Sequence, residues 1–237
     1  MKHRTRVVLQ LAALLFVLGA FSFASSDAYL YIVHGIPGRD IADNLNPGFP
    51  IDILVNGKSC LVRGLTFGNS SGPFTLAAGT YDVQISMANT LSPCTNAVLI
   101  DSQVTLTPGE SLSAVATISS TQPVVLQLTD NLGPVAPGNG RYILIDSADA
   151  PALQATLTQV GVKKPQTFTI SANPGAQTAV GVPAGEYLVQ ITAVGSTTIL
   201  TSQQIDLADQ SVTLSYATGE ELNNTVELVN RVIRDVF

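Results

Sequence analysis

Residues Leu76-Ala77-Ala78-Gly79-Thr80-Tyr81-Asp82-Val83-Gln84-Ile85 recur later in the chain as Val182-Pro183-Ala184-Gly185-Glu186-Tyr187-Leu188-Val189-Gln190-Ile191. Both copies share the pattern Ala-Gly-x-Tyr-x-Val-Gln-Ile. The glycine suits a tight turn, because glycine adopts positive φ angles without a steric penalty. After it, every second residue from Tyr81 to Met87 is apolar, which is typical of a strand with one buried face. The repeated stretch therefore predicts two copies of one β-domain.

The sequence around each copy supports this duplication. β-rich segments separated by turn residues follow one another in a similar order in both parts of the chain, and the turn spacing is that of a β-sandwich. We therefore predict an all-β protein with antiparallel sandwich domains over residues 28–131 and 141–218, joined by a Gly/Pro-rich linker at 132–140. Both the loop after the first strand and the loop at 88–97 are longer in the first copy, so the first domain is the better candidate for binding.

The tail at 219–237 has a different period. Its apolar residues include five at helical spacing, and Thr218 followed by Glu221 fits a capping box. We predict a short C-terminal amphipathic helix, which would pack on the second domain or bind a partner. A strand is the alternative, because several apolar residues of the tail keep the same parity. The residues at helical spacing are Leu222, Val226, Val229, Ile233 and Val236, and those of equal parity are Val226, Leu228, Val232 and Val236.

The N-terminus has the form of a secretory signal peptide. A basic start is followed by an apolar run of about 15 residues, Val7 to Phe21, and then by the small residues that a signal peptidase reads. The run is shorter than the roughly 20 residues that a spanning helix needs. We predict a cleaved signal peptide at 1–24, no membrane span after its removal, and a secreted or periplasmic, surface-associated or released product.

Charge narrows the range of partners. Without residues 1–24 the chain carries 8 basic and 17 acidic side chains, a net charge of −9. Such a charge disfavours nucleic acid as a partner, because the phosphate backbone repels acidic surfaces. The partner we expect is an unidentified protein or glycan of the cell envelope.

Cys60 and Cys94 both lie in the first copy. In an exported protein, two cysteines in one small domain predict a disulfide. A zinc site is the alternative, but two thiols and one distant histidine fall short of a zinc ligand set. We expect no cofactor and no bound metal.

The first domain resembles a bacterial secreted family known as domain of unknown function 4397. The likeness covers roughly residues 28–131 well and 140–218 more weakly, where Asp146 stands in place of the family's histidine. The family implies immunoglobulin-like sandwiches, often in tandem, and no established activity. The residues that carry the likeness are Tyr31-Ile32-Val33-His34, Ile51-Asp52-Ile53-Leu54-Val55-Asn56-Gly57, Leu65-Thr66-Phe67-Gly68, Leu76-Ala77-Ala78-Gly79-Thr80-Tyr81 and Leu128-Thr129-Asp130-Asn131.

Several residues are candidates for a site. The long loop at 35–49 is a candidate binding loop, together with the loops at 69–73 and 88–97. Its oxygen donors do not have the spacing of a calcium-binding EF-hand loop, so a turn-forming loop is the simpler interpretation. A hydrogen bond that fixes this loop is the expected role of His34. The binding-loop residues are His34, Arg39, Asp40, Asp43 and Asn44.

Two further patterns are interpreted as structural. Gly79, Tyr81, Gly185 and Tyr187 form structural turns that resemble the tyrosine corner of sandwich folds. Residues 68–72 match G-x-S-x-G, but a proline and a strand follow, and the histidine of the mature chain lies upstream rather than downstream. We therefore predict no catalytic residues.

The sequence favours an exported, non-catalytic binding or interaction module of the cell envelope or extracellular space. A structural spacer or self-assembling envelope protein is the alternative. A hydrolase is the least favoured function.

Overall fold

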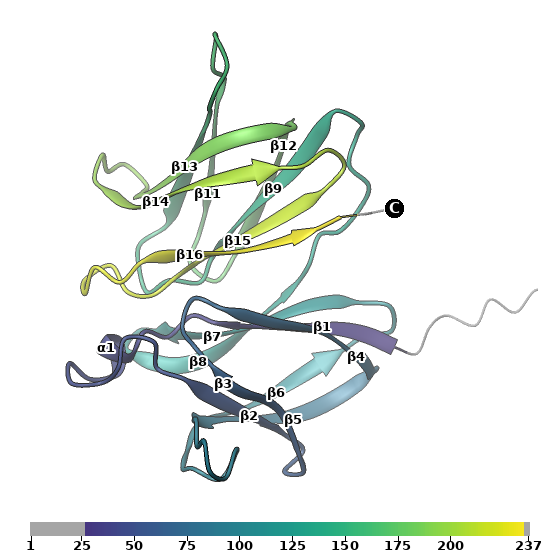
Figure 1. The fold of residues 1–237 in the computed structure, drawn as a ribbon, viewed down its shortest axis with the longest axis vertical. Coiled ribbons are helices and arrows are strands. Elements are labelled where there is room, and N and C mark those ends of the chain that lie inside the picture. Colours follow the sequence, from purple (N-terminus) through teal and green to yellow (C-terminus); the bar gives the residue numbers. More distant parts are fainter. Residues whose placement is uncertain (1–26, 235–237) are drawn as a thin grey trace, which may run out of the picture.

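The computed structural model describes residues 27–234, so the predicted signal peptide lies outside the described residues. Those residues form two stacked β-sandwiches with a single four-residue helix, α1 (Gly38–Ile41), as Figure 1 shows. Each sandwich contains two four-stranded sheets. The predicted all-β sandwich fold is confirmed.

The first half contains eight strands in two sheets. One sheet has the order β4-β1-β7-β8 and the other has the order β3-β2-β5-β6. Between them lies the first core, which includes Phe49, Ile53 and Val104. The strands are β1 (Asp27–His34), β2 (Ile51–Val55), β3 (Ser59–Leu65), β4 (Ser70–Ala77), β5 (Gly79–Met87), β6 (Val98–Leu106), β7 (Ser111–Ser119) and β8 (Gln122–Thr129).

The second half repeats this plan strand by strand. Its sheets have the orders β12-β9-β15-β16 and β11-β10-β13-β14, and a separate core that includes Tyr142, Leu157 and Tyr187 lies between them. The strands are β9 (Asn139–Asp146), β10 (Leu153–Gln159), β11 (Thr167–Ala172), β12 (Gln177–Pro183), β13 (Gly185–Ala193), β14 (Ile199–Leu207), β15 (Val212–Thr218) and β16 (Glu227–Ile233).

Strand pairing is antiparallel in both halves with one repeated exception. β1 pairs with β7 in parallel, and β9 pairs with β15 in parallel. The antiparallel sandwiches expected from the sequence thus each contain one parallel pair. Hairpin signals report on neighbouring strands, whereas these pairs join strands far apart in the chain.

The repeated Gly-x-Tyr stretches lie at matching positions. Gly79 and Gly185 begin β5 and β13 with φ angles of +155° and +149°. The hydroxyls of Tyr81 and Tyr187 each donate to a backbone carbonyl four residues earlier, Ala77 O and Pro183 O, at 2.7 Å. Both corners are therefore closed by the contact that the sequence resemblance implied.

The C-terminal helix predicted for 219–237 is wrong. After a turn, residues Glu227–Ile233 form β16, which pairs with β15 along its whole length. β16 occupies the place that β8 occupies in the first half, so it supplies the edge strand that completes the sheet. The residues at helical spacing lie in different surroundings: Leu222 is exposed in the turn, Val226 packs in the second core before β16 begins, and Val229 and Ile233 of β16 face the first half.

A third apolar core joins the two halves. The outer face of the β4-β1-β7-β8 sheet packs against the outer face of the β12-β9-β15-β16 sheet, as the stacked sheets in Figure 1 show. β15 is buried over all its residues, and β7 is buried over seven of nine, because each is covered on both faces. The residues of this core are Val33, Val115, Leu128, Val135, Ile143, Ile145, Val212, Leu214, Tyr216 and Val229.

The contacts between the halves are reciprocal. His34 pairs with Ala116 and Asp146 with Ala217, so the register relates β1 to β9 and β7 to β15. By this register Thr117 corresponds to Thr218, and Gly35 corresponds to Ser147. Thr117 Oγ1 donates to Ser147 O, and an ideal Cβ at Gly35 would lie only 2.8 Å from Thr218 Cγ2. Each half therefore touches its counterpart with equivalent residues, as in a two-fold symmetric dimer.

Candidate functional site

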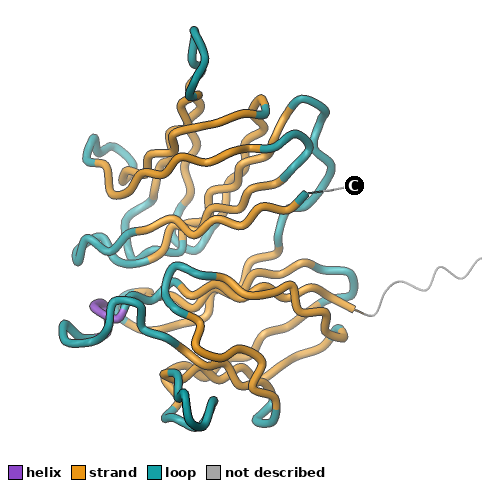
Figure 2. Tube along the Cα trace, viewed as in Figure 1, coloured by secondary structure: helices purple, strands orange, loops and turns teal. Residues whose placement is uncertain are grey.

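Loops of both halves gather at one end of the molecule, which we call the loop end. It consists of residues 35–50, 66–69 and 88–97 of the first half and 147–152, 173–176, 194–198 and 219–226 of the second. Most of these loops lie on the left of Figure 2, and the loop at 88–97 lies at the bottom of the same view. Two sandwiches thus present their loops side by side, and sandwich folds place recognition on such loops.

Four surface hollows open at the loop end. The largest have volumes of about 370 Å³, one between the β7–β8 turn and residues 147–150, the other beside Asp52 and Asn89. Hollows of about 320 and 190 Å³ lie along the junction of the two halves. The second half therefore contributes surface that sequence reasoning had assigned to the first half alone.

The candidate binding loop at 35–49 is anchored to the second half. Asp40, in α1, accepts hydrogen bonds from Thr225 Oγ1 at 2.8 and 3.0 Å and from Asn223 Nδ2 at 3.1 Å. Burial raises the pKa of the Asp40 carboxyl. Arg39 lines the hollow of about 190 Å³, while Asp43 and Asn44 are exposed at the loop's surface. Asp40 thus joins the halves.

His34 fixes the same loop from inside. Its ring is fully buried, with Nε2 at 2.7 Å from Phe49 O and Nδ1 accepting from the Ile36 amide at 3.3 Å. A carbonyl only accepts and an amide only donates, so the ring is neutral with its proton on Nε2. Burial lowers the pKa of His34 to about 4. The histidine therefore holds the loop closed.

Asp146 occupies the equivalent position at the end of β9. It is fully buried, and its Oδ2 accepts from the Leu153 amide at 3.2 Å. Burial raises the pKa of Asp146 to about 7. The two halves thus place at one position a histidine and an aspartic acid that both favour their neutral forms.

We expect these two groups to give opposite pH dependence of stability. The stability that depends on neutral His34 is present above pH 6.5 and is lost as the pH falls through about 4. The stability that depends on protonated Asp146 is present below pH 3.8 and is lost as the pH rises through about 7. Between pH 4 and 6.5 the slopes, each about 1.4 kcal/mol per pH unit, oppose each other.

Single substitutions should separate the two slopes. In His34→Gln the free energy of unfolding should rise, relative to wild type, by about 3 kcal/mol as the pH falls from 6.5 to 4. In Asp146→Asn it should fall by a similar amount over the same interval. Urea unfolding at pH 4, 5 and 6.5 measures both. Variants whose pH profiles run parallel to that of wild type would contradict the assignment.

The predicted loop at 69–73 is for the most part a strand. Ser70 and Ser71 lie in β4 and pair with Val33 and Ile32 of β1. The G-x-S-x-G match at 68–72 therefore runs from a turn into β4, and its serine does not lie on the strand-to-helix elbow that positions a nucleophilic serine. Residues 70–73 add no free loop to the loop end.

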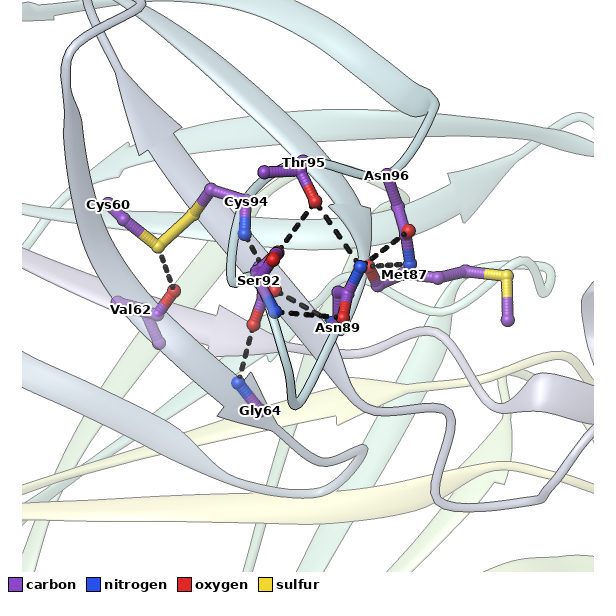
Figure 3. Close-up of a disulfide and its surroundings, with 10 residues drawn as sticks. Cys60, Val62, Gly64, Met87, Asn89, Ser92, Cys94, Thr95 and Asn96 are labelled. Atoms are coloured by element: carbon purple, nitrogen blue, oxygen red, sulfur yellow. Dashed lines mark hydrogen bonds between the residues drawn. A yellow bond between two sulfur atoms is a disulfide. The ribbon is translucent and has the colours of Figure 1, made fainter.

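The loop at 88–97 is exposed and rigidly held (Figure 3). The predicted disulfide joins Cys60 to Cys94, with the Cα atoms 5.9 Å apart. Beneath the loop lies the buried carboxylate of Asp52, which accepts from the amides of Gly64, Asn89 and Cys94 at 2.9–3.0 Å. These bonds tie both ends of the loop to β2 and β3.

Asn89 organises the tip of the loop. Its Oδ1 accepts from the amides of Leu91 and Ser92 at 3.1 and 3.0 Å, and its Nδ2 donates to Thr95 Oγ1 and Asn96 Oδ1 at 3.2 Å each (Figure 3). Side chain–backbone bonds of this kind fix turns in a single conformation. The loop is therefore ordered before any partner arrives.

Apolar side chains are exposed on and beside this loop. Leu91 is 94% exposed at the tip, and Met87, Val98 and Leu99 at its base are 40–48% exposed. Sequence reasoning identified the loop but missed Asp52, Asn89 and Leu91. An aspartate in an otherwise apolar strand was the available signal for Asp52, and an asparagine just after a strand, a common turn-forming position, was the signal for Asn89. Exposure of a single leucine leaves no sequence signal.

Comparisons with known proteins place the chain in a family. Residues 28–156 match the family described as domain of unknown function (DUF4397). The match covers 129 of 237 residues, so the chain belongs to this family, as the sequence resemblance predicted. No curated protein matches the chain.

The solved structures that match the chain have low sequence identity and low TM-scores. The Bacillus anthracis TIE protein is 13% identical, with a TM-score of 0.26; the match covers 80% of this chain and 33% of that chain, so this chain spans about a third of its length. A proposed cell adhesion protein from Bacteroides ovatus is 8% identical, with a TM-score of 0.29, over 90% of this chain and 99% of that one. A similarly described protein from Bacteroides uniformis is 12% identical, with a TM-score of 0.27, over 89% and 99%.

Residues 27–234 contain neither a metal-binding cluster nor a membrane-spanning helix. Within them, no cluster of three or more His, Cys, Asp or Glu side chains is arranged to hold a metal ion. Over the same residues, none of the helical structure has the length and apolar character needed to cross a membrane.

Proposed function

We propose that the protein is an exported, non-catalytic binding module that recognises a protein of the cell envelope or extracellular space through its loop end. The observation that carries the proposal is Leu91, 94% exposed at the tip of a loop that a disulfide and the Asp52 and Asn89 hydrogen bonds hold in place. Pre-ordering a loop removes the entropy cost of fixing it on binding. An aliphatic side chain held on such a loop can serve as the anchor that fills an apolar pocket of a partner.

The chemistry of the loop favours a protein over a glycan. Residues 88–97 carry no charged and no aromatic side chain, and the whole chain contains no tryptophan. Stacking on a sugar ring is commonly provided by aromatic side chains, whereas Leu91 and the flanking apolar residues fit an apolar pocket on a protein. The disulfide supports an oxidising compartment, in line with the predicted signal peptide.

The alternative function, self-assembly, was proposed to use either edge strands or a C-terminal helix, and one of these two features is absent from the described residues. It rested partly on a C-terminal helix, and the tail is instead β16 within the second sandwich. At one sheet edge, Gln127 of β8 also bonds the Gln103 carbonyl and the Thr105 amide of β6 at 2.7 and 3.2 Å, which closes that edge to a further strand.

Substitution of Leu91 tests the proposal. In Leu91→Ser, affinity for the envelope protein captured by the wild-type protein should fall about 30-fold, since a hot-spot side chain is worth about 2 kcal/mol or more. Val162→Ser is the matched control, because Val162 is a 49% exposed apolar residue on the β10–β11 hairpin, away from the loop end. Capture from solubilised native envelope, followed by titration of the captured protein, measures both. Equal loss in both variants, or in neither, would contradict the proposed site.

A further inference from the structure

The two facing sheets are related by a near two-fold arrangement. The registers of β7 with β8 and of β15 with β16 relate Ser113 to Leu214, Val115 to Tyr216 and Leu128 to Arg231. Continuing the register by one residue relates Asp130 to Ile233. A face built this way could in principle pair with a copy of itself as well as with its counterpart, because isologous contacts use the same patch on both partners.

One side of this interface is polar. Arg231 Nη2 lies 2.6 Å from Asp130 Oδ2, and Arg231 Nη1 donates to Ser113 Oγ at 3.2 Å. The guanidinium carbon lies 3.4 Å from the centre of the Tyr31 ring. Arg231 and Asp130 are both almost completely buried, at 8% and 7% exposed. A cation of the second half is thus enclosed by polar and aromatic groups of the first.

The donor and the acceptor of each hydrogen bond at Ser113 can be assigned. Its single hydroxyl proton is donated to Asp130 Oδ1 at 2.6 Å. The hydroxyl of Tyr216, also at 2.6 Å, must therefore donate to Ser113 Oγ. Ser111 Oγ donates to the other carboxylate oxygen at 2.7 Å. The first half supplies the acceptors, and the second half supplies the donors Tyr216 and Arg231.

The related side of the interface is apolar. The residues that correspond to Arg231, Asp130, Ser113 and Tyr31 are Leu128, Ile233, Leu214 and Ile143, and all four belong to the apolar core between the halves. The interface therefore has one charged side and one apolar side. This asymmetry is the feature that distinguishes the two faces.

We propose that the Arg231–Asp130 pair makes each face select the other half of the chain and reject a second copy of itself. If two first halves paired, each Asp130 would be buried with Leu128 in the place of Arg231. If two second halves paired, each Arg231 would be buried with Ile233 in the place of Asp130. An unpaired buried charge disfavours both homotypic pairs, whereas the apolar part of the interface alone would not discriminate.

Cleavage between the halves tests this selection on the folded protein. A protease site placed in residues 133–138 is cut after folding, and native mass spectrometry at rising concentration distinguishes the three possible pairs by mass. For wild type we expect pairs of a first half with a second half and no homotypic pairs. For the double variant Asp130→Leu/Arg231→Leu we expect homotypic pairs of first halves to appear as at least a tenth of all pairs.

A charge exchange provides a second route that does not depend on the apolar variant. A first half with Asp130→Arg should pair with a second half carrying Arg231→Asp, and should not pair with the wild-type second half. The proposal would be overturned if wild type formed homotypic pairs, or if the double leucine variant formed only mixed pairs. It would also be overturned if the charge-exchanged halves paired equally well with exchanged and with wild-type partners. None of these results bears on Leu91, so the proposed binding function is tested separately.

Discussion

Replacing Arg231 with methionine is expected to lower the free energy of unfolding by about 3–5 kcal/mol, because it leaves Asp130 buried without its cation. In the folded protein Asp130 is 7% exposed, and its remaining partners are the hydroxyls of Ser111 and Ser113. Methionine also gives up the contact of the guanidinium with the Tyr31 ring. For a chain of this size the melting temperature should fall by roughly 10 °C.

The position of Arg231 determines which part of the thermal unfolding transition the substitution changes. The residue lies in the interface between the halves, not in the cores inside the sandwiches, so its removal weakens the contact between the halves first. We expect thermal unfolding to separate into two steps in Arg231→Met. Differential scanning calorimetry of the full chain records both the shift and the number of transitions.

The exposed Arg234 provides the matched control three residues further along the chain. Arg234→Met should change stability by less than about 0.5 kcal/mol, the usual effect of a surface substitution. The double variant Asp130→Leu/Arg231→Met should recover most of the loss, since apolar replacement of a buried pair is close to neutral. A full-size loss in Arg234→Met, or an unchanged melt in Arg231→Met, would contradict the role assigned to the pair.

The repeat in the sequence predicted the form of each half but not the way the halves meet. Turn residues and alternation act locally, so the strands around Tyr81 and Tyr187 could be recognised from the chain alone. β7 and β15 are covered on both faces, so their burial does not alternate, although small polar residues alternate with apolar ones in their sequences. An alternating sequence predicts one exposed face, so no local pattern shows that such a strand is buried twice.

The tail also shows that a local sequence pattern is not sufficient to predict the structure. Val226 packs in the second core just before β16 begins, whereas Val229 of β16 packs in the core between the halves, so their helical spacing does not come from one face of a helix. The repeat itself contained the correction, since β8 in the first half has its counterpart after β15 in residues 227–233. Pairing of β16 with β15 along its whole length satisfies backbone groups that a separate helix would leave without partners in the sheet.

Only part of the candidate site could be predicted from the sequence. His34 was expected to fix the loop at 35–49, and it does so through Phe49 and Ile36. Asp40 looked like a residue of an open binding loop, but its partners Asn223 and Thr225 are more than 180 residues away along the chain. Contacts over such separations cannot be inferred without the arrangement of the two halves.

The disulfide is expected to have the second largest effect on stability. Cys60 and Cys94 are 34 residues apart, and closing a loop of that length contributes about 3–4 kcal/mol in the chain-entropy model. Replacing both with alanine should therefore lower the free energy of unfolding by that amount. Reduction of the wild-type disulfide should reproduce the effect, and denaturant unfolding measures both.

The loss should be confined to one part of the molecule. The disulfide ties β3 to the loop at 88–97, while the second half has its own core and no cysteine. Hydrogen exchange should therefore accelerate at the amides of Asn89, Leu91 and Ser92 and stay unchanged in β10 and β13. Asp52 still holds the amides of Asn89 and residue 94, so the loop should loosen without unfolding completely.

Loosening the loop also links stability to the proposed binding. If Leu91 binds because its loop is pre-ordered, the double alanine variant must order the loop on binding and should lose affinity, although it keeps every side chain of the tip. Its association should slow less than its dissociation accelerates, as is usual among variants of one interface. Equal affinity of the oxidised and disulfide-free proteins would show that the pre-ordered loop is not the recognition element, whatever the change in stability.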